Sequence, residues 1–257
     1  SSFIIPSEEL SLHNKKGRNI HALILNNKSF LPGSGDSAEK PFHFEANYNT
    51  SNLYESMEDN AICIAAHPFN SVSIMQGIFF KRGNWEKEDI IPKNMVGLQI
   101  INGSLDNEYF KGKNIWIKLL LNGYHKYIYA GNDAHGNFNL YRQINLPMLT
   151  LKENNDQLFG VFRTGVYTDF KRKDVDAAIY SLKKGNCFIT NGPLVNMTCS
   201  LDKSIYNMGS TVYQHSGLLN IYIKSSPEFG MIKNIIIKKG IISQKNEIDY
   251  LTISNLQ

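Results

Sequence analysis

The sequence has few cysteines, few tryptophans and little excess charge. Its three cysteines, Cys63, Cys187 and Cys199, are odd in number and widely spaced, so they form neither a disulfide framework nor a zinc knuckle. Cys63 and Cys187 lie in apolar stretches, which favours small core residues. The net charge is only +4, which argues against a nucleic-acid-binding protein. No run of about 18 apolar residues occurs, so no membrane-spanning segment is expected.

The chain is long and apolar enough to fold around a sizeable core. It has 257 residues, of which 42% are hydrophobic and 19% charged, and this allows one large domain or two smaller ones. The first residues, "SSFIIPSEELSL", lack the basic and apolar regions of a signal peptide. We expect the chain to be the downstream part of a longer protein.

Short apolar runs alternate with helical patterns up to about residue 195. The spacing predicts helices over 49–60, 114–124 and 172–185, and strands over 19–26, 61–69, 95–103, 126–133 and 187–193. In the last helix Asp174 is the expected N-cap and Gly185 the expected end. Strands that alternate with helices indicate an α/β fold with a mostly parallel sheet or barrel.

The pattern changes after residue 195. Short strands separated by Gly, Ser and Pro turns follow, and no helical periodicity lies between them. We therefore predict two units: an α/β domain over 1–195 and a small β-rich, sandwich-like C-terminal domain over 196–257.

Five potential metal ligands lie where predicted strands end: Glu9, His21, His67, Asp133 and His135. Carboxylates and imidazoles bind Zn, Mn or Fe, and in parallel folds the active site lies at the carboxyl ends of the strands. Each residue also has a simpler interpretation. A histidine on an apolar strand is often a core residue, and "YAGNDAHGNFN" fits a plain turn.

Several segments together resemble the PHP (polymerase and histidinol phosphatase) superfamily, and its CehA/McbA-like branch in particular. They are "IPSEELSLHNKKGRNIHALIL", "AAHPF", "NGYHKYIYAGNDAHG" and "FGVFRTGVY" followed by "AAIYSLKKGNCFITNGPLV". The resemblance covers about residues 3–200 in order. It implies a distorted (β/α)7 barrel that lacks its first strands in this chain, and a metallohydrolase with up to three metal ions.

The resemblance also implies roles for single residues. Glu9, with Glu8 as the second choice, matches a bridging carboxylate, and His21 and His67 complete one metal position. Asp133 and His135 match the closing pair, each serving a different ion. The family's His-x-His strand and a later Asp-His are not found here, and Ser7 replaces a glycine. We therefore expect this chain to bind fewer than three divalent ions, each of them Zn, Mn or Fe.

The expected activity is hydrolysis of a small-molecule phosphoester or a carboxylic or carbamic ester by a metal-activated water. Asp133 and Arg163 are the predicted catalytic residues, with Arg163 as an anion clamp, and Asn102 is a candidate for lining the pocket. Two alternatives stay open. The chain is a catalytically inactive fragment or binding module that acts through the barrel mouth or the β-rich tail, or it is an unrelated α/β domain with coincidental histidines.

Overall fold

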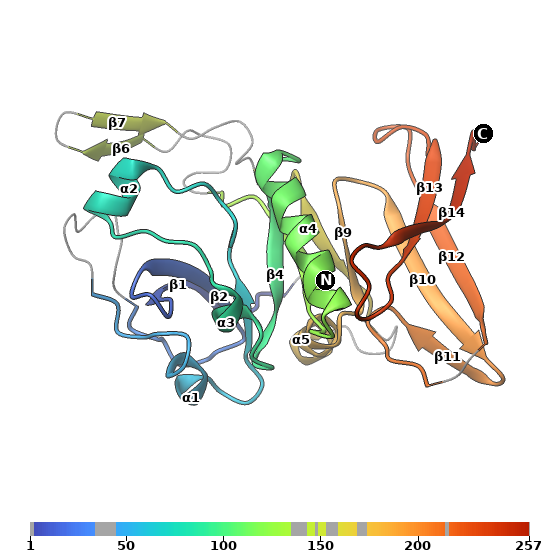
Figure 1. Cartoon of the computed structure of the whole chain (residues 1–257), viewed down its shortest axis with the longest axis horizontal. Helices are drawn as coiled ribbons and strands as arrows, with labels where there is room; N and C mark the ends of the chain where they lie inside the picture. The colour runs from blue at the N-terminus through green and yellow to red at the C-terminus, as the bar shows by residue number, and fades with distance from the viewer. Residues whose placement is uncertain are drawn as a thin grey trace.

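A computed structural model describes residues 3–33, 45–134, 143–146, 149–152, 159–168, 174–213 and 216–256, with the backbone alone for 143–146 and 149–152. Its largest unit is a five-stranded sheet in the order β1-β2-β3-β4-β5 (Figure 1). The strands of this sheet are β1 (Ser7–His13), β2 (Asn19–Leu25), β3 (Ile62–Ala65), β4 (Met95–Asn102) and β5 (Tyr127–Gly131).

The sheet is antiparallel in its first half and parallel in its second. β1 and β2 form a hairpin, β2 pairs antiparallel with β3, and β3, β4 and β5 are parallel. The hairpin turn is closed by a hydrogen bond from the Gly17 amide to the Asn14 carbonyl, and Gly17 has a φ of 67°. This left-handed conformation favours glycine.

The prediction of a (β/α)7 barrel is wrong. Over the described residues the five-stranded sheet is open, and β8 (Arg163–Val166) and β9 (Cys187–Thr190) pair with each other as a separate antiparallel ribbon. The alternation of strands and helices suggested βα units and a mostly parallel sheet or barrel. However, only a short turn separates β1 from β2, and a connection this short joins antiparallel neighbours. The fold is a mixed α/β arrangement of several sheets.

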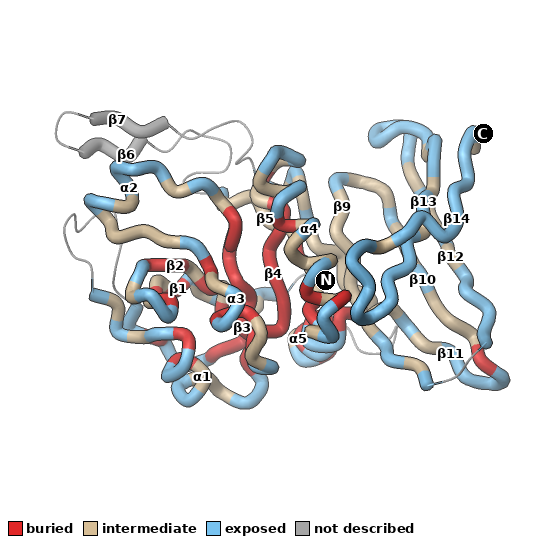
Figure 2. Tube along the Cα trace, viewed as in Figure 1, coloured by how far each residue is buried: buried red, intermediate tan, exposed pale blue. Residues whose placement is uncertain are grey.

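Strands β3 and β4 are buried on both faces of the sheet, whereas β5 is mostly half-buried (Figure 2). One face packs in a cluster that includes Leu10, Ile24 and Leu98, and the other packs in a cluster with Ile62, Ile64 and Tyr129. Because neither face meets water, β3 and β4 are nearly continuous apolar runs rather than alternating ones.

The described residues form five helices. They are α1 (Leu53–Ser56), α2 (Ile74–Phe79), α3 (Lys87–Ile90), α4 (Asn107–Leu121) and α5 (Val175–Lys184). All of them except α2, which has no buried residue, contribute to the core. Leu119 of α4 joins the first cluster, and Ile179 and Leu182 of α5 join the second. Over the described residues, none of the helices combines the length and the apolar character needed to cross a bilayer.

The bounds of the three predicted helices agree with the structure to different extents. α5 is capped by the Asp174 side chain, which accepts a hydrogen bond from the Ala177 amide, and it ends at Gly185 in the left-handed conformation. α4 ends at Asn122 as predicted but begins earlier than 114. The helix expected over 49–60 is only the single turn of α1.

The remaining strands are short. They are β6 (Gln143–Leu146), β7 (Leu149–Lys152), β10 (Leu194–Leu201), β11 (Ser204–Asn207), β12 (Leu218–Lys224), β13 (Asn234–Lys239) and β14 (Ile248–Ser254). The last five form a three-stranded sheet in the order β11-β10-β12 and a β13-β14 pair. The predicted boundary at 195/196 falls just inside β10 and stays a prediction.

Candidate metal centre

The β1–β2 hairpin places Glu9 and His21 on the same face. Leu10 and Leu12 point into the first core cluster, so the strand alternation turns Glu9 to the opposite side. Ser11 is paired with His21 and Glu9 with Leu23, so Glu9 and His21 are diagonal neighbours across the two strands. Diagonal pairs on one face lie within reach of long side chains.

His67 reaches the same place from the end of β3. The Ala66 amide donates to the His21 carbonyl, which carries the pairing of β3 with β2 one residue beyond the strand. The backbone then turns at His67, whose φ is 28°. The imidazole rings of His21 and His67 meet edge to face, with centroids 5.3 Å apart.

The three side chains form a group that could hold a metal ion. Glu9 Oε1 lies 2.7 Å from His21 Nδ1 and 3.0 Å from His67 Nε2. One potential ligand atom from each residue lies within 4.8 Å of the others. Two imidazole nitrogens and one carboxylate oxygen match the three protein ligands of catalytic zinc sites, which leave a position open for water or substrate. The donor set therefore fits a divalent cation, and Mn and Fe accept it as well.

The environment keeps Glu9 ionised. Burial alone would raise the pKa of this carboxyl, but hydrogen bonds and charge interactions with His21 and His67 outweigh it and hold the pKa well below its ordinary value. The exposed fractions of the side chains are 32% for Glu9, 18% for His21 and 6% for His67. A deprotonated carboxylate that is partly screened from solvent is what a metal ligand requires.

Arg82 is a neighbour of this group that the sequence reasoning missed. Its Nη1 lies 2.7 Å from His21 Nε2, and Trp85 Nε1 donates to the His21 carbonyl at 3.1 Å. The surrounding letters, "FFKRGNW", look like a short basic surface turn. No periodicity or motif in them shows that the guanidinium faces the metal ligands.

A cavity of about 240 Å³ lies beside the two histidines of this group, and Glu9 is not part of its lining. Its lining includes His21, His67, Arg82, Asn102 and Asp133. Asn102 is the last residue of β4 and Asp133 lies two residues beyond β5. With His67 beyond β3, three neighbouring strands therefore each contribute a polar side chain at their carboxyl ends.

The other predicted residues lie in different places. His135 is outside the described residues. Arg163 is exposed on β8, with its guanidinium 5.9 Å from the ring centre of Phe229, and it is not among the residues that line this cavity. Its role as an anion clamp stays a prediction. Glu8, the second choice for the carboxylate, accepts a hydrogen bond from the Leu31 amide on the other face of β1.

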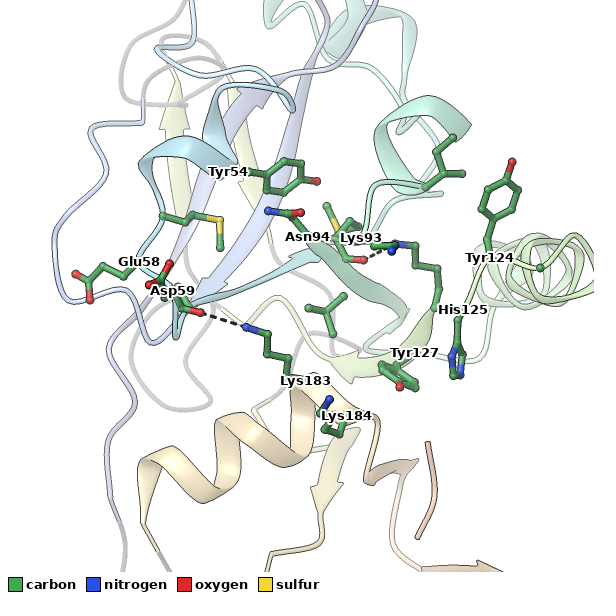
Figure 3. Close-up of a pocket in the computed structure, with 17 residues that line it drawn as sticks. Tyr54, Glu58, Asp59, Lys93, Asn94, Tyr124, His125, Tyr127, Lys183 and Lys184 are labelled. Atoms are coloured by element: carbon green, nitrogen blue, oxygen red, sulfur yellow. Dashed lines mark hydrogen bonds between the residues drawn. The ribbon is translucent and has the colours of Figure 1, made fainter. Parts of the chain in front are cut away.

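A larger cavity, of about 740 Å³, lies at the opposite ends of the parallel strands (Figure 3). Several lysines and tyrosines line it, among them Lys93, Lys183, Tyr124 and Tyr127. Lys183 reaches across it to donate to the Asp59 carbonyl at 3.2 Å. Its lining combines lysines, tyrosines and the acidic residues Glu58 and Asp59, and it does not include Glu9, His21 or His67.

Comparison with known proteins gives this site no independent support. No protein-family model, no curated protein and no solved structure matches the chain.

Proposed function

We propose that the chain is a metal-dependent hydrolase of the PHP type whose divalent cation is held by Glu9, His21 and His67. The observation that carries the proposal is the convergence of these three side chains, from two hairpin strands and the end of β3, within 4.8 Å. The order of these residues along the chain is also that of the motifs in the resemblance.

Each residue has a distinct task in this proposal. A divalent cation, when bound, supplies a Lewis acid and a water of lowered pKa. Glu9 provides negative charge, and His67 and His21 fix the position of the ion from two further directions. Asp133 faces the same cavity, where its carboxylate can accept a proton from the attacking water.

The cavity favours a substrate with an anionic or strongly polar reacting group. Arg82 supplies a permanent positive charge, and Ser71, Gln76 and Asn102 add neutral polar groups to the lining. A phosphoester, or a carboxylic or carbamic ester, is the substrate class that fits this lining. The small volume limits the part that enters the cavity to the reacting group and its immediate substituents.

The direct test combines metal analysis with a hydrolysis assay. The purified protein should bind Zn, Mn or Fe and hydrolyse p-nitrophenyl phosphate or p-nitrophenyl acetate. Glu9→Gln and His67→Ala should each lose both properties. His125→Ala is the matched control. His125 is exposed at the 740 Å³ cavity, and its ring is tilted against that of Tyr127, with centroids 5.2 Å apart. Metal binding that survives His67→Ala unchanged would contradict the proposal.

A non-enzymatic binding module is the second candidate. The C-terminal strands are largely exposed (Figure 2). The observation that favours this candidate is the number of large apolar residues exposed there, such as Ile205, Tyr222 and Tyr250. Such exposure is more typical of interaction surfaces than of isolated sheets. Stoichiometric metal binding without turnover of any ester or phosphoester would favour this candidate over the hydrolase.

A further inference from the structure

Histidine binds a metal ion in its neutral form, and a neutral imidazole has one lone pair to offer. One ring nitrogen carries a proton and donates, and the other accepts. A metal ion needs that lone pair, and the second nitrogen then carries the N–H and needs an acceptor. An arginine side chain has donors only, so it can satisfy the accepting nitrogen of a histidine but never the N–H.

In the structure Arg82 takes this lone pair. Arg82 Nη1 lies 2.7 Å from His21 Nε2, the distance of a strong hydrogen bond, and His21 Nδ1 lies 2.7 Å from the Glu9 carboxylate. These distances assign the proton to Nδ1, which donates to Glu9, while Nε2 accepts from Arg82. Arg82 Nη2 is also 3.2 Å from Nδ1. This longer contact is not a hydrogen bond in that tautomer, because Nδ1 cannot donate to Glu9 and accept from Arg82 at the same time.

We infer that Arg82 and the metal ion compete for His21, so that Arg82 must leave the imidazole before the proposed metal site can fill. The inference rests on the proposed function. It holds for either ring nitrogen as the ligand. If the ion binds Nε2, it takes the place of Arg82. If it binds Nδ1, the proton moves to Nε2 and faces a guanidinium that cannot accept it.

Charge acts in the same direction. The guanidinium stays protonated at any physiological pH. It contacts His21, which would be a ligand of the proposed divalent cation. The side chains of His21 and His67 are mostly shielded from solvent, so this repulsion is screened less than it would be at an open surface.

The competition predicts that loss of a polar residue will strengthen metal binding. Co²⁺ titration of the metal-free protein, followed by visible absorbance, measures the affinity without any need for turnover. Arg82→Met should bind Co²⁺ more tightly than the wild type, by about tenfold or more, because a competing hydrogen bond and a like charge are both removed. Arg18→Met is the control, since Arg18 donates to the Gly77 carbonyl near the same cavity and should leave the affinity unchanged.

The outcomes separate this inference from the proposed function. Equal or weaker Co²⁺ binding by Arg82→Met than by the wild type would refute the competition and leave the metal site intact. Failure of both proteins to bind Co²⁺, with His67→Ala indistinguishable from them, would refute the proposed function and the competition together.

A second measurement determines which ring nitrogen of His21 carries the proton. Long-range ¹H–¹⁵N NMR spectra of the metal-free wild type should show His21 with its proton on Nδ1. Saturation with Zn²⁺ should abolish the signature in which Nδ1 is protonated and Nε2 accepts from Arg82. A metal-free spectrum with the proton on Nε2 would overturn the inference, because the nitrogen 2.7 Å from Arg82 Nη1 would then carry a proton and could not accept from the guanidinium.

Discussion

His67 and Asp133 share a backbone conformation that residues with side chains rarely adopt, and both line the same cavity. Their φ angles are 28° and 49°. Such conformations cost about 1 to 3 kcal/mol each and persist where the surrounding structure enforces them, often at functional sites. In both residues the unusual φ comes directly after a strand of the parallel half of the sheet, where it turns the side chain toward the cavity.

This strain gives a prediction for Asp133. Asp133→Gly and Asp133→Ala both remove the carboxylate, so they should reduce hydrolysis equally. Asp133→Gly should nevertheless be the more stable of the two, by about 1 kcal/mol in urea unfolding, because glycine tolerates positive φ and alanine does not. The same pair of substitutions at Asp202, which has the same φ of 49° in a turn of the C-terminal strands, should show the stability difference with no loss of hydrolysis. Equal stability of the two Asp133 variants would contradict the prediction.

Lys126 should make the stability of the fold depend on alkaline pH. Its side chain is buried, and Nζ donates to the carbonyls of Pro92 and Met95. Burial lowers the pKa of this amine from 10.5 to about 8. Between these values the unfolded chain holds more protons than the folded chain, so the free energy of unfolding rises with pH in that window.

The measurement compares the wild type with Lys126→Met, so that other titrating groups cancel. From about pH 8 to about pH 9.5, the free energy of unfolding of the wild type should rise by about 1 to 2 kcal/mol relative to the variant. Below about pH 7 the difference should be constant, because Lys126 is protonated in both states. A difference that falls with increasing pH would show that the folded state holds the proton more tightly, contrary to the prediction.

Two glycines should respond to alanine in opposite ways. A Cβ on Gly97 of β4 would lie 2.2 Å from the Tyr127 carbonyl oxygen and 2.7 Å from the Tyr129 ring, so Gly97→Ala should reduce the free energy of unfolding by about 2 to 4 kcal/mol. A Cβ on Gly77 of α2 meets nothing within 4 Å, so Gly77→Ala should increase it by about 0.5 to 1 kcal/mol. Thermal unfolding of both variants checks the two signs in one experiment.

The N-cap of α5 can be tested with a conservative pair. Asp174→Ala removes the acceptor for the Ala177 amide and should cost about 1 kcal/mol of stability. Asp174→Asn keeps an oxygen in the same place and should cost much less. Equal losses in the two variants would mean that the negative charge near the helix N-terminus matters more than the hydrogen bond.

Elements with strong local signals were predictable from the sequence. α5 combines an aspartate cap, an apolar stripe and a terminal glycine, and β4 is a continuous apolar run, so each was identified with its type. The topology was not predictable in the same way. A strand's own residues do not reveal the direction of its neighbour, and the short turn at Asn14 and Gly17 makes β1 and β2 an antiparallel hairpin.

The candidate site follows the same division. Glu9, His21 and His67 could be identified because their order matches the motifs of the resemblance. The expectation that they lie at strand ends holds for His67 and is wrong for Glu9 and His21, which lie inside β1 and β2. Arg82 could not, because it lies in a loop where the chain path, and not the sequence pattern, brings it to His21. Its contact depends on residues 61 positions apart in sequence, which local patterns do not encode.

Adjacent carboxylates on opposite sides of one strand have a consequence for the hairpin as a whole. A one-residue slip of β1 along β2 would exchange Glu8 and Glu9, so that Glu8 faced the imidazoles and Glu9 turned toward Leu31. The same slip would bring Leu10 and Leu12, now 2% and 0% exposed, out of the core. Two leucines that lie on the other side of the strand from the candidate ion therefore decide which glutamate would bind it.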